Sequence, residues 1–289
     1  MKKTKTKIVI LFDPDKKKSN QAVSQFLSFA GKDIEIVRQY DINRYKRTQR
    51  FIKLPQNCRY AFVFGGDGSI ITAAKALSYS TLPVVGVNVG KLGYLAEFSI
   101  QEIRRFLGQI VSGKLSIEKR MMLGCTIFRK GKKIFSSTAV NDCFITSGPP
   151  YRMVELQIKV NGQPLAALTG DGLVIASPTG STAYSLSSGG PILSNDMEGF
   201  VITPICPHSL SFRPIVINAK NRIDINGLHV NSGTTVSLDG QISLILTLDD
   251  VISIEKADKH FLVVNNPVRT QWDTLAAKLG WAEKPKYNL

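Results

Sequence analysis

The sequence has little cysteine and no long apolar run, and both absences limit what the protein can be. Its 289 residues include 4 cysteines, which are widely spaced and never form a Cys-x-x-Cys pair. This spacing argues against a disulfide framework and a zinc site, and it favours a reducing compartment. No apolar stretch is long enough to span a bilayer, and the basic residues 1–7 precede an apolar run too short for a signal peptide. We therefore expect a cytoplasmic protein that does not act at a membrane.

Acidic residues are also scarce: the sequence has 22 Asp and Glu against 37 Lys and Arg, which gives a formal net charge of +15. Such a balance is typical of proteins that bind nucleic acids. Much of the excess lies in residues 1–53, which hold 14 basic and 5 acidic side chains, and no zinc-finger or RNA-recognition signature accompanies it. We interpret the charge as a solvated face that attracts anionic nucleotides or polyphosphates, and we expect no nucleic-acid partner.

The order of apolar segments predicts two kinds of structure along the chain. Before residue 120, strand-like and helix-like segments alternate, which is typical of a mainly parallel sheet with crossover helices. The expected strands are 7–12, 34–37, 60–64 and 83–88, and the expected helices are 21–30, 70–77 and 100–111. After residue 120, short runs alternate with turn signals such as Asn161-Gly162, which predicts hairpins and a sandwich-like β domain.

The last part of the chain returns to a helical pattern. Thr270 and Asp273 resemble a capping box, Trp272, Leu275 and Leu279 share one face, and Gly280 can end the helix. The predicted fold class is therefore α/β plus all-β. It comprises an N-terminal Rossmann-like α/β domain over 1–120 (plus 268–289), a C-terminal β-sandwich domain over 121–267, and a C-terminal helix that returns to the first domain.

The first motif with chemical meaning is Gly65-Gly66-Asp67-Gly68-Ser69, between an apolar strand and an alanine-rich helix. Glycines let a ligand approach the main chain, and the N–H groups at a helix start suit a phosphate. Gly65, Gly66, Gly68 and Ser69 are therefore candidates for phosphate binding. Within this pentapeptide, Asp67 has the one side chain that can take a proton from a substrate hydroxyl. An aspartate at such a turn also often serves as a cap, and the pentapeptide alone leaves both functions open.

The second motif begins at Gly170-Asp171-Gly172 and continues through residues 177–191, which are rich in Ser, Thr and Gly. These residues do not build a core, but they present backbone amides and hydroxyls to a phosphate or a ribose. An ordinary Ser/Gly loop is the alternative, which the apolar strand before the loop and Tyr184 within it disfavour. Asp249-Asp250, between two β-runs, is interpreted as a solvated hairpin turn rather than a metal site.

These motifs resemble those of the NAD kinases, which phosphorylate the 2′-hydroxyl of the adenosine ribose of NAD to give NADP. The resemblance covers nearly the whole chain. Its segments are Gly65–Ser69, Asn88–Leu95, Pro178–Leu186 with Gly189–Pro191, and Pro207–Pro214. The Gly-Gly-Asp-Gly turn also occurs in phosphofructokinases and in diacylglycerol or sphingosine kinases. The Pro178–Leu186 segment is highly specific for the NAD kinases.

The resemblance implies an NAD+ kinase that uses ATP as phosphoryl donor and Mg²⁺ or another divalent metal, with inorganic polyphosphate as a donor for some relatives. Asp67 would be the proton acceptor, and no metal ligand is assigned. The NAD-binding residues would be Asp67, Gly68, Asn141, Asp142, Arg152, Asp171, Thr182, Ala183, Tyr184, Ser185, Leu186, Ser187 and Gln241. Asp142 stands where the family carries a longer Glu. Family members usually form dimers or tetramers, so a homodimer or homotetramer is expected.

Three rival interpretations remain at this point. A lipid kinase of the diacylglycerol or sphingosine type would share the glycine turn, but the segment Thr179–Tyr184 argues against it. A nucleotide-binding regulator without catalysis would not need Asp67. A basic nucleic-acid-binding module would bind DNA or RNA with a steep dependence on salt. Product analysis with NAD or a lipid as acceptor separates the two kinases.

Overall fold

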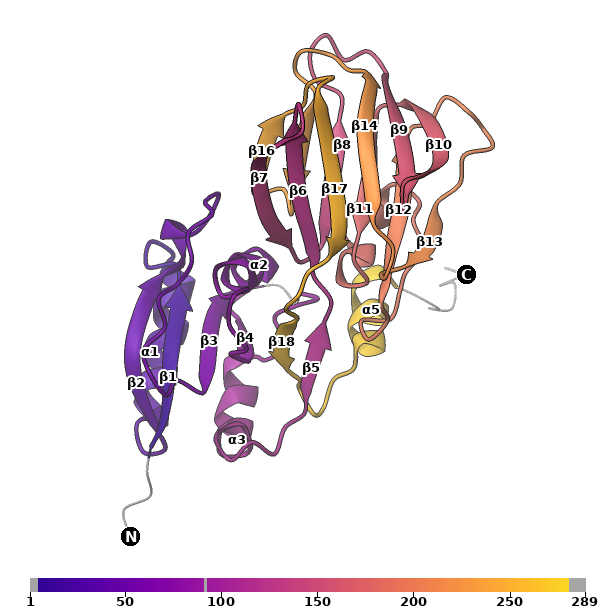
Figure 1. The fold of residues 1–289 in the computed structure, drawn as a ribbon. Coiled ribbons are helices and arrows are strands. Elements are labelled where there is room, and N and C mark those ends of the chain that lie inside the picture. Colours follow the sequence, from indigo (N-terminus) through magenta and orange to yellow (C-terminus); the bar gives the residue numbers. More distant parts are fainter. Residues whose placement is uncertain (1–4, 91–92, 281–289) are drawn as a thin grey trace, which may run out of the picture. The chain divides into compact units, whose positions relative to one another are not determined.

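The computed structural model describes residues 5–90 and 93–280, and the chain divides into two compact units (Figure 1). The first unit comprises Met1–Lys46, Arg50–Glu118 and Leu262–Leu289, and the second comprises Arg47–Gln49 and Lys119–Phe261. Each unit has its own hydrophobic core. Among the described residues, no helix combines the length and the apolar character that crossing a bilayer requires.

The first unit is built on a six-stranded sheet in the order β2-β1-β3-β4-β18-β5. Neighbouring strands from β2 to β18 pair in parallel, as the alternating pattern predicts. Phe26 packs against Phe62 and Phe64, with ring centroids 5.0 and 5.3 Å apart, and so joins a helix to the central strand. The elements are β1 (Thr6–Phe12), α1 (Lys17–Ala30), β2 (Ile34–Asp41), η1 (Ile42–Arg44), β3 (Tyr60–Gly65), α2 (Asp67–Ala76), β4 (Val84–Asn88), α3 (Ile100–Val111), β5 (Ile117–Arg120) and β18 (Phe261–Val264).

The second unit contains two antiparallel sheets of six strands, in the orders β10-β9-β14-β17-β6-β7 and β13-β12-β11-β8-β15-β16. One core holds residues of both sheets, such as Leu156 and Ile158 from one and Leu173 and Ile175 from the other. The predicted β-sandwich is therefore confirmed. Its elements are β6 (Leu123–Arg129), β7 (Lys132–Ala139), β8 (Asp142–Thr146), β9 (Val154–Val160), β10 (Gln163–Gly170), β11 (Gly172–Ala176), η2 (Thr179–Thr182), α4 (Tyr184–Ser187), β12 (Gly199–Ile205), β13 (Ile215–Asn218), β14 (Ile223–His229), β15 (Thr235–Leu238), β16 (Ile242–Ile245) and β17 (Asp250–Lys256).

The hairpin between β9 and β10 follows the local sequence. Asn161 and Gly162 have φ angles of 51° and 79°, the left-handed conformations that a two-residue hairpin turn requires. Asn and Gly adopt such conformations at low cost, so this turn is encoded by the two residues that form it.

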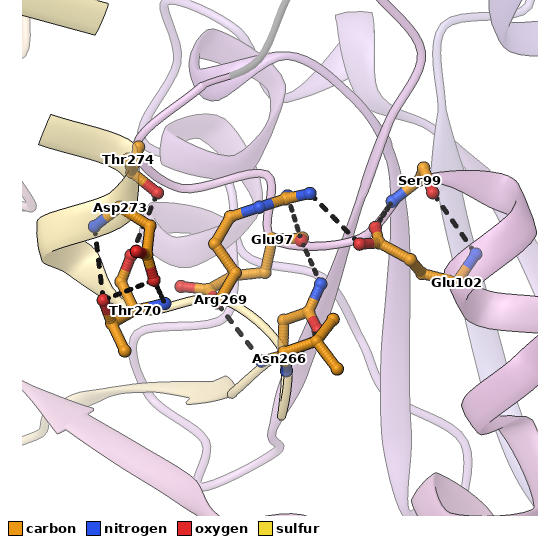
Figure 2. A network of polar contacts seen from close by, with 9 residues as sticks. Glu97, Ser99, Glu102, Asn266, Arg269, Thr270, Asp273 and Thr274 are labelled. Atoms are coloured by element: carbon orange, nitrogen blue, oxygen red, sulfur yellow. Dashed lines mark hydrogen bonds and ion pairs between the residues drawn. The ribbon is translucent and has the colours of Figure 1, made fainter. Parts of the chain in front are cut away.

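The C-terminal helix α5 (Gln271–Leu279) belongs to the first unit, which confirms that the chain returns to this part of the fold. Thr270 and Asp273 form the predicted capping box, and Gly280 ends the helix with a φ of 60°. Polar contacts hold the segment before the helix, as Figure 2 shows. Arg269 donates to the carbonyl oxygen of Glu97 at 3.0 Å and to Glu102 Oε1 at 3.1 Å.

Asn266 adds a second link to the same loop. Its side-chain amide donates to the Glu97 carbonyl oxygen at 2.8 Å (Figure 2). Leu275 is buried, whereas Trp272 is 52% exposed. The apolar face predicted from the sequence is therefore only partly buried, and the polar network fixes where α5 begins.

Candidate functional site

The first candidate region is the turn between β3 and α2, where Asp67 is the first residue of the helix. Its carboxylate is held by three backbone N–H groups of the segment after β4. Oδ2 accepts from Tyr94 at 2.9 Å, and Oδ1 accepts from Leu95 at 2.9 Å and from Ala96 at 3.3 Å. Asp67 is therefore not simply a cap for its own helix, because its side chain is fixed by a segment from elsewhere in the chain.

Glycines around Asp67 serve two different purposes. A Cβ on Gly65 would overlap the Ser69 side chain, and a Cβ on Gly93 would overlap the Asp67 carboxylate, so both positions require glycine. Gly66 and Gly68 are exposed, and a Cβ on either would meet no described atom within 4 Å. Their backbone is therefore open to a ligand, as phosphate binding requires. Lys91 and Leu92, which belong to the motif Asn88–Leu95, lie outside the described residues.

Lys278 of α5 is a neighbour of Asp67 that the sequence did not reveal. Its Nζ lies 3.8 Å from Asp67 Oδ2 and 4.2 Å from the centroid of the Tyr94 ring. Sequence reasoning missed this lysine because it lies in a helix far along the chain, with no motif that links it to the glycine turn.

The second candidate region lies in the second unit, around residues 140–142. The Asp239 carboxylate accepts from the backbone N–H groups of Val140 at 2.9 Å, Asn141 at 2.7 Å and Asp142 at 3.2 Å. This carboxylate fixes the backbone of the predicted Asn141-Asp142 pair. Asp239 was not predicted, although it adjoins Gln241 in a turn after β15.

Asp142 is a buried carboxyl group with 3% of its surface exposed. Burial, and to a smaller degree the negative charge of Asp239, raises the pKa of Asp142 to about 7, while a hydrogen bond from the Tyr184 backbone opposes that rise. The group therefore changes charge near neutral pH. Titratable groups with such perturbed pKa values are concentrated at functional sites.

The Ser/Thr/Gly-rich loop packs directly on this turn. The backbone N–H of Ser177 donates to the Asn141 carbonyl oxygen at 2.8 Å, and its hydroxyl donates to the Val140 carbonyl oxygen at 2.5 Å. A Cβ on Gly180 would overlap the Asn141 carbonyl oxygen, so the close approach requires glycine. The structure thus brings together two sequence segments that were predicted separately.

Tyr184 lies near two of the carboxyl groups predicted to bind NAD. Its ring meets that of Phe144 edge to face, with centroids 5.0 Å apart. Burial raises the pKa of Tyr184, and the negative charges of Asp142 and Asp171 raise it further. Asp142 and Asp171 are therefore grouped around Tyr184, and its contact with a nucleotide stays a prediction.

The remaining predicted residues differ in accessibility. Thr182, Ala183, Leu186 and Gln241 are partly exposed, and Arg152, Asp171 and Ser187 are exposed or nearly so, as the burial pattern of their segments shows. Ser185 is fully buried, and its hydroxyl is hydrogen-bonded to that of Thr203 at 2.8 Å. The hydroxyl of Ser185 therefore faces the interior of the second unit, as do the buried hydroxyls of Ser177 and Ser181 in the same loop.

Comparison with known sequences gives a consistent result for both parts of the chain. The ATP-NAD kinase N-terminal domain matches residues 5–115, and the ATP-NAD kinase C-terminal domain matches residues 140–266. The NAD kinase of Desulforamulus reducens is 43% identical over 205 residues, which cover 71% of each chain. The NAD kinase of Geobacter metallireducens is 38% identical over 232 residues, which cover 80% of this chain and 82% of that one.

Two solved structures share the fold. Yeast NADH kinase complexed with NADH superposes with a TM-score of 0.82 and 25% identity, over 98% of this chain and 89% of that one. An NAD kinase from Archaeoglobus fulgidus in complex with ATP has a TM-score of 0.73 and 21% identity, over 95% of this chain and 98% of that one, which shows a common fold. Because curated relatives match over most of both chains and both domain families are present, the chain belongs to the ATP-NAD kinase family.

Proposed function

We propose that this NAD+ kinase transfers the γ-phosphoryl group of ATP to the 2′-hydroxyl of the adenosine ribose of NAD, with Asp67 as the proton acceptor. The observation that carries the proposal is the fixed Asp67 carboxylate beside the exposed glycines 66 and 68. A catalytic carboxylate must be held in place, and the phosphates of the donor need an open backbone beside it.

The reaction can be written from these groups. The ribose oxygen attacks the γ-phosphorus, the bond from that phosphorus to the β–γ bridging oxygen breaks, and the hydroxyl proton passes to Asp67. Each carboxylate oxygen has about two lone-pair directions, and Oδ2 accepts a single backbone hydrogen bond from the described residues. A positioned base of this kind contributes about 10²–10⁴-fold to the rate.

The second unit supplies the groups proposed to bind NAD. Asn141, Asp142 and Asp171 offer amide and carboxylate partners for ribose hydroxyls or the adenine amine. Tyr184 offers an aromatic face. The proposed set also includes Arg152, residues 182–187 and Gln241. The yeast NADH kinase of the same fold was solved with NADH bound, which supports a nicotinamide dinucleotide as the ligand here.

Magnesium is proposed to enter with the donor as MgATP. Among the described residues, no group of three or more His, Cys, Asp or Glu side chains is placed to hold a metal. Mg²⁺ in kinases is commonly held by phosphate oxygens and water with only one or two carboxylates, so this arrangement suits a metal carried by the substrate. The metal would neutralise charge on the phosphates during transfer.

The proposal also covers the oligomeric state and the cellular location of the protein. We propose a homodimer or homotetramer, as is usual in the family, which light scattering would measure. All four cysteines, including the exposed Cys206, are free thiols, which supports a reducing cytoplasm as the location.

The decisive experiment measures NADP after incubation with Mg²⁺, NAD and either ATP or polyphosphate. Asp67→Asn should keep the fold and lose at least about 100-fold in turnover, because it removes the base. Asp41→Asn is a matched control, since the Asp41 side chain has the same exposure of 30% and a comparable ion pair with Arg44 at 3.6 Å. Wild-type turnover in Asp67→Asn would refute the proposed role of Asp67.

A further inference from the structure

Lys278 is the charged partner of the proposed base. Among the described residues, it is the one cation within ion-pair distance of Asp67, with Nζ 3.8 Å from Oδ2. Both side chains are partly covered, because 27% of the Lys278 side chain and 30% of the Asp67 side chain is exposed. Partial removal of water strengthens the attraction between two opposite charges at this distance.

The position of Lys278 is set by contacts at the opposite end of its helix. Arg269 and Asn266 tie the segment before α5 to Glu97, and the capping box of Thr270 fixes the first turn (Figure 2). A capped helix is stiff over two turns, so the anchoring of its start also places the last turn. Lys278 reaches Asp67 because α5 is attached to the loop around Glu97.

Tyr94 completes a closed set of three contacts. Its backbone N–H donates to Asp67 Oδ2, and its ring lies 4.2 Å from Lys278 Nζ. An ammonium group over an aromatic face is attracted by the ring electrons. Lys278 is therefore held on one side by the carboxylate and on another by the ring. It makes no hydrogen bond to a residue in the described part of the chain, so its position depends on these two contacts.

We propose that Lys278 is a positioning residue for phosphoryl transfer, whose ammonium holds the Asp67 carboxylate in its orientation between α5 and the segment 93–96. This inference rests on the proposed role of Asp67 as base. A base must be held where it can accept the hydroxyl proton, and the ion pair restrains one of the two carboxylate oxygens. Lys278 thus acts on the transfer step through the position of Asp67.

The groups that face Asp67 are few, so the effect of Lys278 can be isolated. The segment 93–96 contributes backbone N–H groups and Tyr94, whose phenol pKa is raised first by burial and then by the charge of Asp67. That phenol therefore stays neutral over the range in which the enzyme would be assayed. Helix α5 contributes Lys278, and no other charged side chain among the described residues contacts Asp67.

The test compares kcat and KM for NAD in two variants. Lys278→Met keeps the length of the side chain and removes the charge, whereas Lys278→Arg keeps the charge. Loss of the ion pair leaves one oxygen of Asp67 less restrained, so kcat of Lys278→Met should fall about three- to tenfold while its KM for NAD stays close to wild type. Lys278→Arg should recover most of that kcat.

Lys256→Met is the matched control. The Lys256 side chain has a similar exposure of 29% and pairs with Glu198 of the second unit, and neither residue is assigned to the reaction. The kcat of Lys256→Met should match that of wild type. A merely structural role of Lys278 would lower the urea unfolding midpoint of Lys278→Met without lowering kcat of the folded enzyme. An unchanged kcat in Lys278→Met, or an equal loss of kcat in Lys278→Arg, overturns the inference.

A second measurement does not depend on turnover. If Lys278 acts on Asp67, the change in urea unfolding midpoint caused by Lys278→Met should be smaller in the Asp67→Asn background. Equal changes in both backgrounds would overturn the inference. A wild-type protein that forms no NADP would refute the proposed function instead, and this double-mutant cycle would then decide the inference by itself.

Discussion

Asp142→Asn should stabilise the protein at pH 8 but far less at pH 5. The side chain of Asp142 is buried, and its pKa is raised to about 7 by burial and by the charge of Asp239. Asparagine has the same shape as the protonated acid, and its side-chain oxygen can accept from the Tyr184 backbone as the carboxyl does. The substitution therefore removes a buried charge and keeps the local hydrogen bond.

The sign follows from proton linkage. Between pH 4 and pH 7 the folded state keeps a proton on Asp142 that the unfolded chain has released, since an unfolded aspartate has a pKa of about 3.9. The free energy of unfolding of the wild type therefore falls as pH rises through this window and levels off above pH 7. A pKa of about 7 gives a loss of about 2–3 kcal/mol between pH 5 and pH 8.

Urea unfolding followed by far-ultraviolet circular dichroism at pH 5, 6, 7 and 8 measures this effect. The stability gain of Asp142→Asn over wild type should grow with pH and reach its plateau near pH 8. Asp224→Asn is a control in the same unit, because it loses an ion pair with Arg222 at 3.0 Å and should not gain stability at pH 8. A gain for Asp142→Asn that is equal at pH 5 and pH 8 would refute the reasoning.

Two further substitutions test contacts that only the structure reveals. Gly93→Ala places a methyl group onto the Asp67 carboxylate and should lower NADP formation at least about tenfold. Gly90→Ala is the control, because its methyl group meets no described atom within 4 Å, and it should leave NADP formation unchanged. Equal activity of the two variants would contradict the assigned contact. Arg129→Met removes two hydrogen bonds, 2.7 and 2.9 Å long, from the buried Asp250 carboxylate and should lower the melting temperature at pH 7, because it leaves a buried charge without its partner. An unchanged melting temperature would count against this ion pair.

Several features could be predicted from the sequence because neighbouring residues encode them. The apolar run before Gly65 forms a strand that is buried along its length, and the glycine turn follows it. Thr270 and Asp273 form their capping box, and Asn161-Gly162 forms its hairpin. Each depends on the backbone preferences and hydrogen bonds of residues within a few positions of one another.

Other expectations failed where distant segments meet. Asp249-Asp250 has the pattern of a solvated turn, and Asp249 does lie in an exposed turn, but Asp250 is 1% exposed and pairs with Arg129 from a neighbouring strand. Ser185 lies in a loop whose composition predicts a ligand-facing surface, but its hydroxyl bonds to Thr203 in the interior. In both cases no local pattern indicated which partner would lie opposite.

The sequence by itself determined the fold class and the family, and it singled out Asp67 and the loop 177–187. Only the tertiary structure decided the surroundings of these residues: the N–H groups of residues 94–96 and Lys278 around Asp67, and Asp239 beside Asp142. The physical reason is that charge pairing and loss of water depend on distances between segments that are far apart in the chain. Residues close together in sequence do not specify those distances, whereas local backbone preferences fix strands, turns and caps.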